Sequence, residues 1–310
     1  MRKIIFAVIT VIALAFGAIT LEACGNTEKY DIVCTIFPQY DFVKEIVGDE
    51  CKVKMLLPYG TDAHNYELKL GDKKAIADSK LFICIGGESE KWVGGVQKST
   101  DLSNVSVITW MEHADLIAIK EEKTHKHESE EGKFDDYDEH VYLSIKNCKN
   151  FVTVISEELC WLYPEKSDVF KKNAAKLTGE LTALDGDYEQ LAAATTNGTI
   201  YFADRFPFAY LVRDYGWKCV TPYKGCSADL EISISDKVEF TDAYENSQAK
   251  GVCIIENGNK ELANSVLREK SGEIFELHSC QAVSKKEMES NTHYVDLMRK
   301  NLGIFREALL

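Results

Sequence analysis

The chain has 310 residues, of which 45% are hydrophobic, and 50 Asp and Glu against 36 Lys and Arg give it a formal net charge of −14. Such a balance disfavours nucleic acid as a partner, because phosphates select basic surfaces. The length is sufficient for two ordinary domains, each with its own core.

The N-terminus has the order of an export signal. Arg2 and Lys3 precede an apolar run over residues 4–21, and small residues follow that run. This order of charge, apolar run and small residues is typical of a signal peptide that is removed after export. A single membrane-spanning anchor is the alternative, although the run is short for it. We therefore expect residues 1–23 to be a signal peptide.

The signal ends in the sequence LEAC, residues 21–24. This sequence resembles the lipobox of bacterial lipoproteins, in which the cysteine becomes the lipidated first residue of the mature chain. The resemblance implies lipidation of Cys24. Acyl chains on Cys24 would hold a soluble protein on the lipid bilayer, at the extracytoplasmic side of the cell membrane.

Short apolar runs alternate with segments of helical spacing along the rest of the chain. The first four runs are YDIVCTIF, CKVKMLL, KLFICIGG and VSVIT, and the later four are GTIYFAD, GWKCVTP, GVCIIEN and GEIFELHS. Strands that alternate with helices predict an α/β fold with parallel sheets flanked by helices. Two such series predict two lobes, over residues 24–163 and 197–310.

Residues 164–196 separate the two series and predict one long connecting helix. Pro164 suits a first helical turn, and at 1.5 Å per residue the segment would span about 45 to 50 Å. Gly179 and Gly186 disfavour an unbroken helix, and a helical hairpin within one lobe is the alternative. The apolar positions at helical intervals are Val169, Phe170, Ala174, Leu177, Leu181, Leu184, Tyr188 and Leu191.

Residues 120–140 form a strongly charged segment within the first lobe. The segment carries nine carboxylates together with His125, His127 and His140, and it has almost no apolar residue. We expect a solvated, mobile loop. His125 and His127 among carboxylates predict weak metal capture, and an inert solvated segment is the alternative.

The chain has ten cysteines, and nine of them remain to be placed once Cys24 is assigned to the lipobox. Several of them lie in apolar runs, where a small buried side chain is expected. In an exported protein, disulfides between Cys219 and Cys226 or between Cys253 and Cys280 are conceivable, but spacing does not define connectivity.

Candidate ligand residues follow the predicted strands. His64 lies in the loop after CKVKMLL, His278 closes EIFELHS, and Asp204 with Arg205 closes TIYFADR. In open α/β sheets, ligands bind outside the carboxyl ends of the strands. We therefore expect these residues near one site, although their separation in sequence does not show that they converge.

Four segments resemble one family in order along the chain: TIFPQYDFVKEIVGD, LLPYGTDAHNYEL, DEHVYLS and YVDLMRKNLGIFREAL. They look like the zinc/manganese-binding lipoproteins of bacterial ABC importers. The resemblance implies that His64 and His140 are metal ligands. Tyr142 stands where the family usually has tryptophan.

The family's third ligand position falls on Arg205, which cannot bind a cation. The resemblance then leaves Asp204 as a substitute oxygen ligand, or a water in the open position, and it places a fourth ligand at His278. Three imidazoles with at most one carboxylate favour Zn(II) over Mn(II). Asp62, Glu67 and Glu139 are candidates to orient the imidazole rings.

The resemblance implies a monomeric metal-binding protein, not an enzyme, that captures Zn(II), or less readily Mn(II), and delivers it to an ABC permease in the membrane. Three alternatives remain open. Arg205 would also suit a binder of an anionic ligand or metal chelate, a zinc-dependent hydrolase is conceivable without an HExxH or GxSxG motif to support it, and a surface adhesin is the third.

Overall fold

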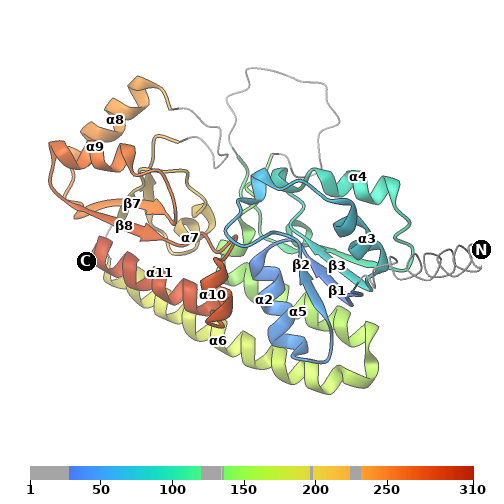
Figure 1. Ribbon diagram of the computed structural model, residues 1–310. Coiled ribbons are helices and arrows are strands. Elements are labelled where there is room, and N and C mark those ends of the chain that lie inside the picture. The colour runs from blue at the N-terminus through green and yellow to red at the C-terminus, as the bar shows by residue number, and fades with distance from the viewer. Residues whose placement is uncertain (1–27, 120–133, 135, 196–197, 224–231) are drawn as a thin grey trace, which may run out of the picture.

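A computed structural model describes residues 28–119, 134, 136–195, 198–223 and 232–310 (Figure 1). The predicted signal peptide, Cys24, and the acidic segment with His125 and His127 lie outside the described residues. Within them, no helix has the length and apolar character that crossing a membrane requires. The model has two α/β lobes, as predicted, with a long helix beneath both of them.

The N-terminal lobe contains one parallel sheet, formed by all four of the first apolar runs. Its strands are β1 (Ile32–Cys34), β2 (Val53–Met55), β3 (Leu81–Cys84) and β4 (Ser106–Thr109), in the order β2-β1-β3-β4. All neighbouring strands pair in parallel. Their carboxyl ends therefore meet at one edge of the sheet.

Helices cover both faces of this sheet, which explains why its strands are apolar on both sides. Ile32 and Leu81 point into the main core, and Val33 and Phe82, the next residues along each strand, point into a second core on the other face. The helices are α2 (Phe37–Val47), α3 (Leu70–Asp78), α4 (Trp92–Ser99) and α5 (Ile145–Leu162).

The C-terminal lobe repeats this arrangement with the later four runs. Its strands are β5 (Thr199–Tyr201), β6 (Lys218–Val220), β7 (Gly251–Ile255) and β8 (Glu273–Leu277), paired in parallel as β5 with β6 and β7 with β8. A parallel bridge between Phe202 and Cys253 joins the two pairs. The helices are α7 (Ala209–Asp214), α8 (Ile234–Glu245), α9 (Glu261–Glu269), α10 (Lys285–Glu289) and α11 (Tyr294–Leu309).

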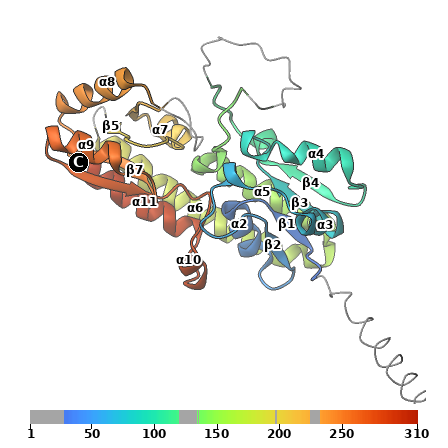
Figure 2. The same ribbon diagram turned by 45° about the horizontal axis from the view of Figure 1, so that its top comes forward.

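The connecting segment forms one unbroken helix, α6 (Ser167–Ala194), after a short 3-10 turn over Pro164–Lys166. It packs against α5 and α2 of the N-terminal lobe and against α11 of the C-terminal lobe. Figure 1 shows it beneath the two lobes, and in the turned view of Figure 2 it runs behind them. An added Cβ at Gly179 or Gly186 would meet nothing, so neither glycine is required by packing. Of the predicted apolar positions, only Val169 is exposed.

The structure corrects one expectation about local structure and decides one possibility that the sequence left open. The predicted solvated loop ends earlier than His140, because Phe134, Glu139 and His140 are buried against the N-terminal lobe. Cys253 and Cys280 are free, buried thiols and not a disulfide. The register explains this, since Phe275 lies opposite Cys253 in the β7–β8 pair and Cys280 follows the end of β8. Cys226 lies outside the described residues.

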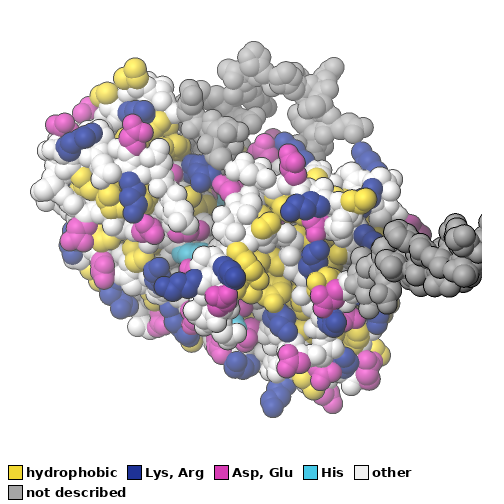
Figure 3. All heavy atoms as spheres, in the orientation of Figure 1, with side chains coloured by type: hydrophobic (Ala, Val, Ile, Leu, Met, Phe, Trp, Pro, Cys, Tyr) yellow, Lys and Arg dark blue, Asp and Glu magenta, His cyan; other side chains and the backbone are white. Residues whose placement is uncertain are grey.

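The face in Figure 3 shows how the excess of carboxylates is distributed. Acidic and basic side chains are interspersed over both lobes on this face. The negative net charge is therefore not gathered into a single patch on this side of the molecule.

Candidate metal centre

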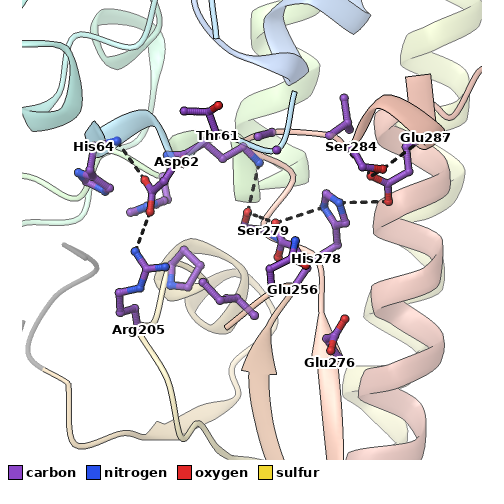
Figure 4. Close-up of a pocket in the computed structure, with 18 of the residues that line it drawn as sticks. Thr61, Asp62, His64, Arg205, Glu256, Glu276, His278, Ser279, Ser284 and Glu287 are labelled. Atoms are coloured by element: carbon purple, nitrogen blue, oxygen red, sulfur yellow. Dashed lines mark hydrogen bonds and ion pairs between the residues drawn. The ribbon is translucent and has the colours of Figure 1, made fainter. Parts of the chain in front are cut away.

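A pocket of about 500 Å³ lies where the two lobes meet. Its walls come from loops at the carboxyl ends of strands in both sheets, as expected for an α/β site. His64 and His140 line it from the N-terminal lobe, and Arg205 and His278 line it from the C-terminal lobe (Figure 4).

His64 is carried by the loop after β2. The carboxylate of Asp62 caps the short 3-10 turn Ala63–Asn65, because its Oδ1 accepts the backbone N–H of His64 at 3.0 Å. This cap satisfies a backbone donor that the turn itself leaves open. The pKa of Asp62 is lowered, since burial raises it but the bonds from Arg205 and the His64 N–H lower it more. Asp62 therefore holds the loop as a carboxylate.

His140 stands at the end of the acidic segment, just before the 3-10 turn Val141–Leu143 that leads into α5. Asp138 Oδ1 contacts both its backbone N–H, at 2.8 Å, and its ring Nδ1, at 2.9 Å. A proton on Nδ1 in this bond leaves the lone pair of the neutral ring on Nε2. The His140 ring is thus oriented to offer Nε2 to a metal.

Glu139 places a carboxylate beside the His64 and His140 rings. Its Oε2 accepts hydrogen bonds from the backbone N–H and the hydroxyl of Ser89, both at 2.9 Å. Its Oε1 is buried and has no hydrogen-bond partner among the described residues. Gly87 allows this close approach, because a Cβ there would overlap the Glu139 side chain. A buried oxygen without a partner is costly unless a ligand satisfies it.

His64, Glu139 and His140 each place one ligand atom within 4.8 Å of the others, and we call these three residues the ligand cluster. His64 Nε2 lies 3.5 Å from Glu139 Oε1. Ligands about 2.0 to 2.2 Å from a tetrahedral zinc ion lie about 3.3 to 3.6 Å apart, so this spacing fits a shared ion. Two imidazoles and a carboxylate form a donor set that zinc accepts.

His278 lines the pocket but lies away from His64 (Figure 4). Its Nδ1 accepts the backbone N–H of Cys280 at 2.9 Å, and its Nε2 faces Glu287 Oε1 at 3.5 Å. In this conformation both ring nitrogens point to groups of the C-terminal lobe. The ligand role of His278 stays a prediction.

Asp204 and Arg205 lie after β5. Asp204 is buried, its Oδ1 accepts the N–H of Arg205, and its Oδ2 faces Gly258, outside the residues that line the pocket. Burial raises the pKa of Asp204. Arg205 lines the pocket and forms an ion pair with Asp62 at 2.7 Å. The ligand role of Asp204 also stays a prediction.

The family resemblance predicted that His64 and His140 share one site, and Glu139 was predicted only to orient an imidazole ring. The position of Glu139 directly before His140 is the feature of the sequence that could have indicated a ligand. Of the other two orienting candidates, Asp62 bonds the backbone of His64, and Glu67 is exposed at the surface. Asp138, which does contact the His140 ring, was missed.

Two α/β lobes joined by a long helix, with histidines and a carboxylate converging between them, define a two-lobe binding protein of the metal-binding class. The family model ZnuA, described as zinc-uptake complex component A, periplasmic, matches residues 32–308. The chain belongs to this family, which confirms the resemblance found in the sequence.

Curated relatives agree with this membership. The zinc-binding lipoprotein AdcA of Streptococcus pneumoniae is 30% identical over 309 residues, which cover 97% of this chain and 60% of AdcA. The chain thus spans about 60% of the length of that relative. The high-affinity zinc uptake system protein ZnuA of Bacillus subtilis is 26% identical, over 97% of this chain and 96% of ZnuA.

Solved structures share the fold. The Zn(II)-bound ZnuA-like domain of S. pneumoniae AdcA has a TM-score of 0.74 and 26% identity, and the match covers 91% of this chain and 99% of that domain. The metal-dependent lipoprotein YcdH of B. subtilis has a TM-score of 0.77 at 24% identity, with 91% and 100% covered.

Proposed function

We propose that this protein captures Zn(II) outside the membrane at the ligand cluster and delivers it to an ABC import permease. The observation that carries the proposal is the convergence of three ligand atoms, one of which, Glu139 Oε1, is buried and has no hydrogen-bond partner within the described part of the chain. Family membership and the zinc-binding names of the relatives support the choice of cargo and of the importer as partner.

The donor set bears on metal preference. Two imidazole nitrogens favour Zn(II), while the oxygen of Glu139 is a donor that Mn(II) also accepts. Three protein ligands leave one tetrahedral position for water or a further ligand. We expect zinc to bind more tightly than manganese, by a smaller margin than an all-histidine set would give.

Calorimetric titration of the chain without its signal peptide tests the proposal. We expect one tightly bound Zn(II) per chain, and loss of that site in both His64→Ala and His140→Ala. His113→Ala is the matched control, because His113 is also partly buried but lies outside the pocket. Tight binding that persists unchanged in both cluster variants would exclude the ligand cluster as the zinc site.

We further propose that His125 and His127 capture metal weakly ahead of the tight site. Deletion of residues 124–131 should remove only weak zinc binding from the titration. Loss of the tight site in this variant would contradict the proposal.

We also propose that Cys24 is lipidated and anchors the mature chain to the membrane, in keeping with the lipoprotein relative. Detergent phase partition tests this. The wild-type chain, expressed with its signal in a bacterium, should enter the detergent phase, and Cys24→Ser should remain in the aqueous phase. Equal partition of the two would argue against a lipid anchor.

A second candidate cargo is a complex of zinc with a small carboxylic acid. The pocket is larger than a bare ion needs, and the guanidinium of Arg205 lines it. Four carboxylates also line this pocket, those of Asp62, Glu256, Glu276 and Glu287, and they disfavour an anion. Citrate that strips zinc from the protein supports the free ion, and citrate that binds together with zinc supports the complex.

Zinc-dependent hydrolysis is the remaining class to test. The family is a component of zinc uptake, which favours binding over catalysis. Turnover of ester, peptide or phosphate substrates by the zinc-loaded chain, lost in His64→Ala, would place hydrolysis ahead of transport.

A further inference from the structure

Two hydrogen bonds connect the C-terminal lobe to a residue of the ligand cluster. Arg205, which follows β5, donates from a guanidinium nitrogen to Asp62 Oδ2 at 2.7 Å. The other oxygen of Asp62 accepts the backbone N–H of His64 at 3.0 Å. Figure 4 shows this path from Arg205 through Asp62 to His64. All three residues of the cluster belong to the N-terminal lobe, yet one of them is fixed from the other lobe.

The backbone of the same loop is held from the C-terminal lobe as well. The N–H of Ala63 donates to Gln281 Oε1 at 3.1 Å, and the N–H of Gly60 donates to the carbonyl of Val283 at 2.9 Å. The loop that carries His64 is therefore attached to the C-terminal lobe at three points. Of these, the Arg205–Asp62 pair is the charged one and the one whose acceptor also bonds His64.

Charge explains why an arginine is tolerated beside a cation site. The side chains of Arg205 and Asp62 are only 22% and 24% exposed, so solvent and salt screen them less than a surface pair. A guanidinium at this depth repels a divalent cation. Asp62 pairs with Arg205 at 2.7 Å and offsets that charge, so removal of Asp62 would increase the repulsion of a cation in the pocket.

We propose that Arg205 is a positioning residue that fixes His64 through Asp62, so that the geometry of the zinc site depends on the C-terminal lobe. This proposal rests on zinc binding at the ligand cluster. It gives Arg205 a role at the position where the family resemblance calls for a metal ligand.

Zinc affinity, measured by competition with a chromophoric chelator, tests the proposal. The variants are Arg205→Met, Asp62→Asn, the double variant, and Arg205→Lys. Arg213→Met is the matched control, because Arg213 of α7 also crosses to the N-terminal lobe, where it pairs with Asp115 and not with the His64 loop. Thermal unfolding of each variant in EDTA shows whether it folds and how much stability it loses.

We expect Arg205→Met to weaken zinc binding about tenfold and Asp62→Asn by about 10- to 100-fold, the range for residues that orient metal ligands. Asp62→Asn loses more because it removes the negative charge that offsets Arg205 in the wall of the pocket. The double variant should lose less than the product of the two single losses, because the residues act through one another. Arg205→Lys, which keeps the charge, should recover most of the affinity, and Arg213→Met should stay within about twofold of wild type, since it leaves the loop intact.

The outcomes separate this proposal from the proposed function. A wild-type chain that binds no zinc contradicts the proposed function itself. If wild type binds zinc and His64→Ala does not, but Arg205→Met and Asp62→Asn match Arg213→Met, only the positioning role is overturned. The positioning role is also overturned if the affinity loss of the double variant equals the product of the two single losses. It is overturned as well if Arg205→Met and Arg213→Met lose zinc affinity to the same extent for the same fall in unfolding temperature.

Discussion

The two walls of the pocket carry similar residues and hold them differently. In the N-terminal lobe, His64, Glu139 and His140 place their ligand atoms within 4.8 Å of one another. In the C-terminal lobe, His278 lies between Glu256 and Glu287, at 3.8 Å and 3.5 Å from its two ring nitrogens. His64 and His278 each follow a parallel strand, and both groups combine imidazole with carboxylate.

The hydrogen-bond partner of each ring nitrogen Nδ1 accounts for the difference. His140 is contacted through Nδ1 by a side chain of its own segment, which leaves Nε2 for a metal, whereas His278 accepts the N–H of Cys280 on Nδ1 and turns Nε2 toward Glu287. A neutral imidazole has one acceptor nitrogen, and that of His278 is occupied by the backbone. The composition of a pocket therefore does not define a metal site, because the partner of each ring decides which nitrogen can reach the ion.

Among the substitutions that test this difference between the two walls, Glu139→Gln is expected to cause the largest loss of zinc affinity. Glutamine keeps an oxygen for the Ser89 bonds but removes the anionic ligand, so zinc affinity should fall by more than about 100-fold, beyond the loss for a residue that only orients a ligand. The matched change on the other wall, Glu287→Gln, should cost less than about tenfold. Chelator competition measures both, and equal losses would show that the two walls contribute alike.

A smaller effect is expected from Gly87→Ala, which leaves every ligand in place. The added methyl would overlap Glu139, so the carboxylate must move. Overpacking of a dense site costs about 1 to 3 kcal/mol of unfolding free energy. Urea denaturation without metal should show that loss, and zinc titration should show weaker binding. Gly95→Ala, in the exposed face of α4, is the control, because a Cβ there meets nothing.

His278→Gln is expected to change zinc affinity less than Gly87→Ala, by about threefold or less, because His278 is bonded within its own lobe. A loss as large as that of Glu139→Gln would show that His278 turns toward the ion when zinc binds, and it would restore His278 as a ligand. The same chelator competition decides between the two.

The smallest effect concerns His293, a histidine beside carboxylates outside the pocket. It lies between α11 and α2, where Nδ1 bonds Asp41 Oδ1 at 2.9 Å, and this bond, opposed by burial, raises its pKa from 6.5 to about 9. A raised folded-state pKa adds stability that is complete below pH 6.5 and is lost as the pH rises through about 9. Urea denaturation of the metal-free chain should show this decline, and His293→Gln should flatten it. A wild-type profile that is already flat would contradict the ion pair.

Much of the fold could be predicted because strands and helices follow from the local spacing of apolar residues. All eight apolar runs form strands, and the apolar positions from Phe170 to Leu191 form one buried face of α6. The rule that loops at the carboxyl ends of parallel strands meet placed His64 and His278 in one pocket, whereas His140 was assigned to the site only by the family resemblance.

The rest depends on contacts between distant residues, which spacing does not encode. Glu139 is placed by Ser89, 50 residues earlier, and Arg205 reaches Asp62 across 143 residues. The orientation of His278 depends on Cys280, whose backbone N–H bonds Nδ1, and Cys280 is a free thiol that does not form the disulfide with Cys253 that spacing allowed. Each of these contacts depends on the direction in which a side chain points in the folded protein, which the spacing of residues in the sequence does not give.

The continuous helix α6 constrains how the two lobes can move relative to one another. It packs against α5 and α2 of the N-terminal lobe and against α11 of the C-terminal lobe, so wide separation of the lobes would break one of these sets of contacts or bend the helix. A 28-residue helix without a hinge spreads any bending over many turns. The loop that carries His64 is a much smaller element, held to the C-terminal lobe by the bonds from Arg205, Gln281 and Val283. Under the proposed function, a permease that breaks these few bonds would reach the zinc ion while both lobes stay packed on α6.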